Sequence, residues 1–163
     1  MSEGARAILL IGRLCSGKTT YARALMARER AVLLSADALM RTLFPEPLGE
    51  RYDVYAARCI AYLYRQAREL VDAGVTVILD FGFWTRADRA AAVEALSGVP
   101  LDWRYLSPPD AEWRRRIAHR NAQIESGRAS PDDYYVDAGL LHKLESRFEP
   151  PVTEERLNET VIE

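Results

Sequence analysis

The chain has 163 residues, 48% of them apolar and 28% charged, the composition of a globular protein large enough to bury a sizeable core. Its formal net charge of −2 gives no overall attraction to anionic membranes or nucleic acids, which disfavours a long nucleic acid as a partner. With no basic leader, no long apolar segment and two cysteines, we expect one cytoplasmic domain over residues 1–163, without a membrane segment or a disulfide framework.

The first predicted element is a short apolar strand over residues 7–11, followed by the pattern Gly-x-x-x-x-Gly-Lys-Thr from Gly12 to Thr19 and then a helix. Glycines let the backbone wrap closely, so that successive N–H groups point at phosphate oxygens. A chance match is expected on the order of 0.005 times per chain, so a glycine-rich turn with a chance lysine is the weaker interpretation. The pattern predicts a nucleotide site in which Lys18 reaches the β- and γ-phosphates and the Thr19 hydroxyl holds Mg²⁺.

The residues expected to contact the nucleotide belong to this loop and to the first turn of its helix: Gly12, Cys15, Ser16, Gly17, Lys18, Thr19 and Thr20. Cys15 has two interpretations. A nearby lysine and a helix N-terminus favour a thiolate, which predicts a reactive thiol. The motif itself favours the other interpretation, a small residue that fits the loop.

A second predicted strand covers residues 31–34, and Ser35 and Asp37 follow it directly. Parallel sheets place ligand groups just beyond the carboxyl ends of their strands. Asp37 is therefore a candidate general base facing the γ-phosphate, and Arg41, one helical turn further on, is a candidate for holding the substrate. On position alone, an equally good interpretation is that Ser35 or Asp37 caps the helix that follows.

After a proline-containing loop, the pattern predicts a long helix over residues 50–73 and a strand over residues 75–80 that ends in Asp80. In P-loop proteins an aspartate at the end of a neighbouring strand binds Mg²⁺, directly or through water. We therefore expect Asp80 to join Thr19 in holding the metal, and keep it as a candidate contact to the acceptor. The alternative is an aspartate that simply ends the strand.

The remaining elements are a helix from Thr85, a strand over 101–106, a basic helix over 111–126, a polar loop over 127–135, a helix over 137–148 and a weakly patterned last strand within 156–162. We expect residues 111–147 to form a small lid over the nucleotide. On the basic helix, Arg120 projects into the apolar stripe and Arg116 lies at its edge. A triphosphate would satisfy both guanidinium groups, and the alternative is a salt bridge to a carboxylate.

These features together resemble the P-loop kinase-like family of AAA-type ATP-binding proteins, which includes zeta toxin, chloramphenicol phosphotransferase and the kinase domain of phage polynucleotide kinase. The resemblance rests on five stretches of sequence: Gly12–Thr19, Ser35–Arg41, Leu79–Arg86, Arg115–Asn121 and Phe148–Pro151. It implies an α/β P-loop NTPase fold, a three-layer α/β/α sandwich with a parallel sheet and an arginine-bearing helical lid. It also implies that Phe148–Pro151 lies near the nucleotide base.

The resemblance further implies an NTP-dependent kinase that uses ATP or GTP with Mg²⁺ and phosphorylates a hydroxyl of a small molecule. In that function Lys18, Asp37, Arg116 and Arg120 are catalytic, and the acceptor lies among Asp37, Arg41, Asp80 and Arg86. Two alternatives stay open. One is a polynucleotide or nucleoside 5′-kinase, although the sequence shows no basic stripe for a strand, and the other is a nucleotide-binding switch without a small-molecule acceptor.

Overall fold

A computed structural model gives the structure of this chain and describes residues 4–130 and 135–163. Its centre is a five-stranded sheet with strand order β2-β3-β1-β4-β5, in which every neighbouring pair is parallel. The strands are β1 (Ala7–Ile11), β2 (Val32–Ser35), β3 (Val77–Gly82), β4 (Leu101–Leu106) and β5 (Thr160–Ile162). β1 lies in the middle, and each of its residues is fully buried, which explains its uninterrupted apolar sequence.

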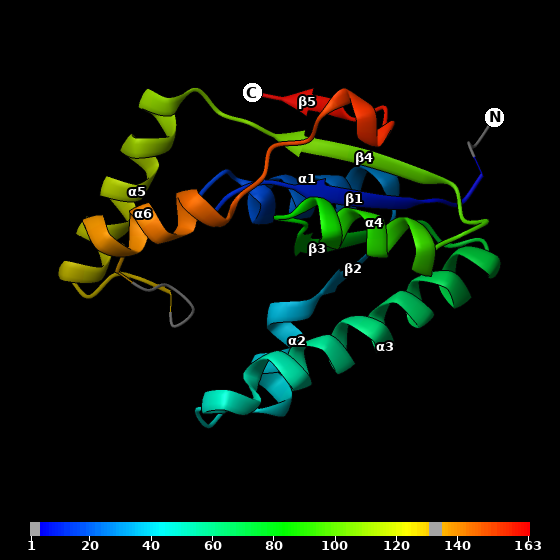
Figure 1. Ribbon diagram of the computed structural model, residues 1–163, viewed down its shortest axis with the longest axis horizontal. Coiled ribbons are helices and arrows are strands. Elements are labelled where there is room, and N and C mark those ends of the chain that lie inside the picture. The colour runs from blue at the N-terminus through cyan, green and yellow to red at the C-terminus, as the bar shows by residue number, and fades with distance from the viewer. Residues whose placement is uncertain (1–3, 131–134) are drawn as a thin grey trace.

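Helices cover both faces of the sheet, as the fold class predicted from the sequence requires (Figure 1). They are α1 (Lys18–Glu29), α2 (Ala36–Leu43), α3 (Tyr52–Asp72), α4 (Arg86–Ala95), α5 (Asp110–Glu125) and α6 (Ala138–Arg147). One core cluster lies between the sheet and α3 and α4, and a second lies between the sheet and α1. Within the described residues, no helix has both the length and the apolar composition needed to cross a membrane.

The predicted strand over residues 75–80 is shifted in the structure, where β3 covers Val77–Gly82. Its end pairs with β1 as Ile11 opposite Gly82, after a register irregularity between Leu9 and Ile11. Asp80 therefore lies inside the strand, two residues before its end, and not at the terminus that the pattern predicted. The error arose because the aromatic and glycine residues after Asp80 are typical of a loop, whereas pairing with β1 keeps them in the sheet.

Helices α5 and α6 lie beyond the carboxyl ends of the strands, separate from the helices that flank the sheet (Figure 1). This is the position expected of a lid over a P-loop site. The predicted lid, residues 111–147, and its polar loop, residues 127–135, include residues 131–134, which lie outside the described residues.

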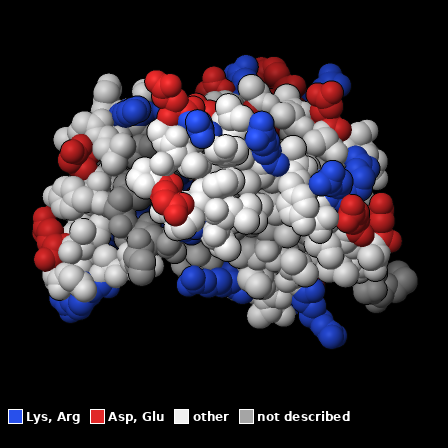
Figure 2. Space-filling view, turned by 90° about the horizontal axis from the view of Figure 1, so that it is seen from below, with Lys and Arg blue, Asp and Glu red and all other residues white. Residues whose placement is uncertain are grey.

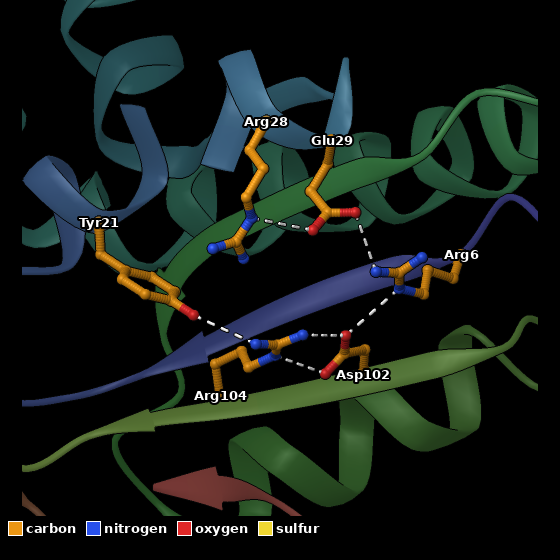
Figure 3. A network of polar contacts seen from close by, with 6 residues as sticks. All are labelled: Arg6, Tyr21, Arg28, Glu29, Asp102 and Arg104. Carbon is orange, nitrogen blue, oxygen red and sulfur yellow. Dashed lines mark hydrogen bonds and ion pairs between the residues drawn. The ribbon is translucent and has the colours of Figure 1, made fainter. Parts of the chain in front are cut away.

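A network of charged side chains fastens α1 to the strands beneath it (Figure 3). Arg104 donates two hydrogen bonds of 2.7 Å to the Asp102 carboxylate and one of 3.2 Å to the Tyr21 hydroxyl. Arg6 donates to Asp102 at 3.2 Å and to Glu29 at 3.0 Å. Burial opposes the ionisation of Asp102, but the hydrogen bonds from Arg104 and Arg6 outweigh it and lower the pKa of this carboxyl group. The network ties both ends of α1 to β1 and β4.

Candidate active site

The P-loop connects β1 to α1, and a side chain at either of its two glycines would meet neighbouring atoms or strain the backbone. The N–H of Gly12 donates to the carbonyl oxygen of Gly82 at the end of β3, at 3.3 Å. A Cβ atom on Gly12 would overlap the Ser16 Oγ and lie 3.2 Å from the Leu106 carbonyl oxygen. Gly17 has a φ of 96°, in the left-handed region, and begins α1. The sequence pattern therefore reflects a real steric requirement of this loop.

Lys18 points back across the loop and donates hydrogen bonds to the carbonyl oxygens of Gly12, at 2.7 Å, and Arg13, at 2.8 Å. Burial lowers the pKa of its ammonium group, while the nearby Asp80 and Asp37 carboxylates act to raise it. The side chain is thus a half-buried amine held by the loop backbone, and its ammonium form has the charge needed to neutralise a phosphate.

The pairing of β2 with β3 brings Asp37 and Asp80 close together, and both carboxylates act on the pKa of Lys18. Ser35 of β2 pairs with Asp80 of β3, so Asp37 follows two residues beyond that pair. Burial raises the pKa of the Asp80 carboxyl group, Lys18 opposes this rise and Asp37 adds to it. The cap of α2 is Ser35, whose hydroxyl accepts from the Ala38 N–H at 3.2 Å. Because Ser35 fills that role, the exposed carboxylate of Asp37 is not needed as the cap.

The side chains around Lys18 suit Mg²⁺. Thr19 lies in the first turn of α1 with an exposed side chain, and Asp80 and Asp37 supply carboxylate oxygens. In residues 4–130 and 135–163 no cluster of three or more His, Cys, Asp or Glu side chains has the arrangement of a metal site. Mg²⁺ needs no such cluster, because it keeps several waters and takes one or two carboxylates together with substrate phosphates. Thr19 and Asp80 stay the predicted ligands.

The two lid arginines singled out from the sequence both reach the P-loop from α5. Arg116 donates from Nη1 to the Ser16 carbonyl oxygen at 3.0 Å and from Nε to the Glu112 carboxylate at 2.9 Å. Arg120 Nη1 lies 3.2 Å from the Cys15 Sγ. Arg116 therefore forms the salt bridge to a carboxylate that was the alternative to phosphate binding. Its guanidinium group also contacts the P-loop.

Trp113 holds α5 against the P-loop, a role that the sequence did not reveal. Its indole N–H donates to the Leu14 carbonyl oxygen at 2.6 Å, and the Arg13 guanidinium carbon lies 3.7 Å from the centre of its ring. Asn121, further along α5, exchanges two hydrogen bonds of 2.8 Å with the backbone of Val136. Trp113 is buried, and the need of a buried indole N–H for a hydrogen-bond acceptor was the available signal.

Two cavities adjoin these residues. One, of about 300 Å³, lies beside α2 and is lined by Asp37, Arg41 and Tyr52 among others. The second, of about 530 Å³, lies beside α1 and is lined by residues of the P-loop, the lid and the sheet: Ser16, Gly17, Thr20, Tyr21, Leu106, Arg116 and Ile162. Asp37 lines the first cavity and also acts on the pKa of Lys18 in the P-loop.

Two predicted positions lie apart from this cluster. Arg86 is the first residue of α4, and among the described residues no hydrogen bond or ion pair joins its guanidinium group to Lys18, Asp37 or Asp80. Phe148 packs against Trp84 and Tyr105, in the cluster on the α3 and α4 face. The cavity beside α1 is on the other face, so the expected position of Phe148 near the nucleotide base stays a prediction.

Comparisons with known proteins agree with this geometry. The model of the AAA domain family (AAA_33) matches residues 8–151. None of the curated protein sequences matches the chain.

Several solved structures share the fold. Kti12 from Chaetomium thermophilum, solved with ADP-AlF3, superposes with a TM-score of 0.70 at 21% identity, over 96% of this chain and 88% of that one. A gluconokinase from Sinorhizobium meliloti gives 0.65 at 16% identity, over 98% and 83%. The Mycobacterium tuberculosis APS kinase CysC, solved with AMPPNP and APS, gives 0.63 at 18% identity, over 91% and 84%.

Proposed function

Since this chain belongs to the AAA domain family and has the fold of P-loop kinases, we propose that it is an NTP-dependent phosphotransferase acting on a hydroxyl of a small molecule. The observation that carries the proposal is the position of Asp37. Its carboxylate acts on the pKa of Lys18, and it also lines a cavity of about 300 Å³ whose described lining contains no P-loop residue. A general base between a phosphate site and an acceptor-sized cavity is the arrangement that phosphoryl transfer to a hydroxyl requires.

In the proposed reaction, the bond between the γ-phosphorus and its bridging oxygen breaks, and a new P–O bond forms to the acceptor. Asp37 takes the proton of the acceptor hydroxyl. Lys18, Arg116 and Arg120 neutralise charge on the phosphates. Thr19 and Asp80 would hold Mg²⁺, which would supply further positive charge there. The P-loop backbone, from Gly12 to Thr20, orients the nucleotide.

A small acceptor is consistent with the size of the cavity, and two of the similar structures are of kinases named for small substrates, gluconate and APS. Arg41 lines the same cavity as Asp37, which supports its role as an acceptor contact. Arg86 lies outside this cavity lining, so an acceptor role for it has less support.

The test is transfer of labelled γ-phosphate, with ATP and GTP in parallel, to a panel of nucleosides, oligonucleotides, sugars and antibiotic alcohols. Wild-type protein should label one class of acceptor. Lys18→Ala should abolish use of the nucleotide, whereas Asp37→Asn should keep nucleotide affinity and lose about 10²–10⁴-fold in transfer rate, the range of general base catalysis.

The matched control is Asp72→Asn, at the exposed C-terminal end of α3, which should transfer at the wild-type rate. Equal transfer by Asp37→Asn and wild type would remove Asp37 as the base. Nucleotide hydrolysis that no acceptor stimulates would favour the nucleotide-binding switch.

A further inference from the structure

We infer that the cavity beside Asp37 accepts a neutral or cationic alcohol with an apolar body, and that it discriminates against anionic acceptors such as sugar acids and phosphorylated strands. This inference rests on the proposed function, whose acceptor site it specifies. It follows from the size, the wall and the charge of the cavity.

The cavity is bounded by α2, by the loop that follows it and by the first turn of α3. Its volume, about 300 Å³, is at the small end of the range for pockets that hold compact ligands, about 300–1,000 Å³. Asp37 is in the first turn of α2, so its carboxylate marks the position that the reacting hydroxyl has to reach. The remainder of the cavity is left for the body of the acceptor.

Apolar side chains make most of that wall. Met40, Phe44 and Leu48 line it, together with two prolines of the connecting loop, Pro45 and Pro47. The Phe44 ring is stacked on Tyr55 of α3, with 4.8 Å between ring centres, which fixes its orientation. Binding a hydrocarbon or aromatic body against this apolar surface is favourable, because it removes apolar area from water. The same surface offers a polyol few hydrogen bonds.

The charges of the lining disfavour an anion. Among the described residues that line the cavity, Asp37 and Glu46 are acidic and Arg41 is the one cation, so the lining carries a net negative charge. An acceptor with a carboxylate or a phosphate would meet two carboxylates against one guanidinium group, so the net charge repels it, whereas the same net charge attracts an ammonium group. Figure 2 shows acidic and basic side chains scattered around a wide uncharged area, with no continuous basic band on that face.

Tyr52 adds a hydrogen bond donor. Burial raises the pKa of its hydroxyl, and the Asp37 and Asp53 carboxylates raise it further, so the group remains protonated near neutral pH. It lines the cavity together with Asp37 and Arg41, and can donate to an acceptor oxygen. The site therefore combines an apolar wall with a few polar groups that orient one molecule.

The experiment compares matched acceptors that share a phenyl ring and a hydroxyl but differ in charge: phenylethanolamine, phenylethylene glycol and phenyllactate. A sugar acid and a thymidine monophosphate with a free 5′-hydroxyl complete the panel. Binding is measured by ligand-observed NMR with a non-hydrolysable nucleotide and Mg²⁺, and transfer is measured with labelled ATP and GTP. The amine and the glycol should exceed phenyllactate by about tenfold or more in kcat/KM, because a like charge at the site opposes binding.

Glu46→Gln should reduce the preference for the amine over the glycol several-fold. The matched control Glu50→Gln lies in the short turn before α3 and outside the cavity lining, and it should leave that preference unchanged. Better use of phenyllactate, the sugar acid or the nucleotide than of the amine and the glycol overturns the inference but keeps the kinase. Failure of both the amine and the glycol to bind also overturns it. Binding of these two without transfer to any acceptor supports the cavity assignment and contradicts the proposed kinase instead.

Discussion

Gly12 and Gly17 are the residues whose conformational demands shape the P-loop. The space that a Gly12 side chain would need is taken by the Ser16 Oγ, which is buried and makes no hydrogen bond among the described residues. Gly17 combines a left-handed backbone with the close approach of Arg116, whose Nη1 would lie 3.1 Å from an added Cβ. The loop conformation, and with it the direction of the backbone N–H groups, depends on both residues.

Gly12→Ala should therefore weaken nucleotide binding about 5- to 150-fold, because the added methyl group displaces Ser16 or the Leu106 carbonyl, and overpacking of this kind costs about 1–3 kcal/mol. Isothermal calorimetry with ATP measures the affinity, and a urea melt measures stability. Gly139→Ala is the control, because Gly139 lies in α6, where the nearest atom to an added Cβ is 3.4 Å away. Unchanged nucleotide affinity in Gly12→Ala would contradict the steric account.

Lys18 makes nucleotide binding dependent on pH. Burial lowers its pKa, so the ammonium charge that phosphate requires is lost at a lower pH than in an exposed lysine, and affinity should fall as the pH rises through that lowered pKa. Asp80→Asn removes a carboxylate that raises this pKa, so the fall should begin at a still lower pH.

The measurement is the dissociation constant of ATP from pH 7 to pH 10 in EDTA, so that any role of Asp80 with Mg²⁺ does not enter. Asp88→Asn, at the start of α4, is a control that should leave the pH profile in place. A profile that Asp80→Asn shifts to higher pH would show that the carboxylate does not support the charge of Lys18.

At the scale of elements, the sequence predicted most helices and strands because their apolar periodicity reflects burial. The predicted helix over 111–126 is α5, Asp110–Glu125, and the strand over 101–106 is β4. Thr85 caps α4 through a capping box with Asp88, as its position before a helical pattern indicated. The predicted end of β3 was wrong, because strand pairing overrides the local preferences of aromatic and glycine residues.

Local sequence patterns could not predict interactions between residues that are far apart in the chain. Arg89 is a charged residue that is fully buried in α4. Its guanidinium group donates to the two oxygens of Glu155 at 2.7 and 3.0 Å, and to the Phe83 carbonyl oxygen at 2.9 Å. A partner 66 residues away cannot be read from helical periodicity. The pair fixes the segment that leads to β5.

Glu155→Gln should destabilise the protein by about 3–5 kcal/mol, because it leaves a buried guanidinium group without its counter-ion. The hydrogen bonds from Arg89 depress the pKa of Glu155 in the folded state below its ordinary value of 4.5. The stabilisation is therefore fully present above that value and is lost as the pH falls through the depressed pKa.

Urea unfolding of wild type and Glu155→Gln from pH 3 to pH 7 tests this. The difference between the two proteins should be largest near neutral pH and should shrink toward acid pH. Glu154→Gln, the exposed neighbour, should unfold like wild type at every pH. A difference that grows toward acid pH would contradict the assigned pKa shift.

At the scale of the whole molecule, the strand order gathers residues that are far apart in the sequence. Placing β1 between β3 and β4 brings the P-loop next to Asp80 on one side and to the start of α5 on the other. The P-loop pattern predicted a phosphate site and the strand-end rule predicted Asp37 as a candidate base, and both stay predictions. The two cavities and the contact of Trp113 with Leu14 required the tertiary structure, since they depend on how α2 and α5 pack.

Because the P-loop joins the sheet to the lid, a bound nucleotide should stabilise the entire fold. At a concentration of ATP and Mg²⁺ about 100 times the dissociation constant, linkage predicts about 2.7 kcal/mol, which for a chain of this size raises the Tm by about 5–11 °C. Lys18→Ala should show no such rise.

Arg116→Ala should show a reduced rise, since Arg116 lines the cavity beside α1 and contacts Ser16. Arg114→Ala is the matched control, because Arg114 lies on the same helix with an exposed side chain that pairs with Glu145 at 3.8 Å, and its rise should equal that of wild type. Scanning calorimetry with and without nucleotide measures each shift against the variant's own baseline. An equal loss in Arg114→Ala and Arg116→Ala would mean that the lid acts through its general charge and not through the contact of Arg116 with the loop.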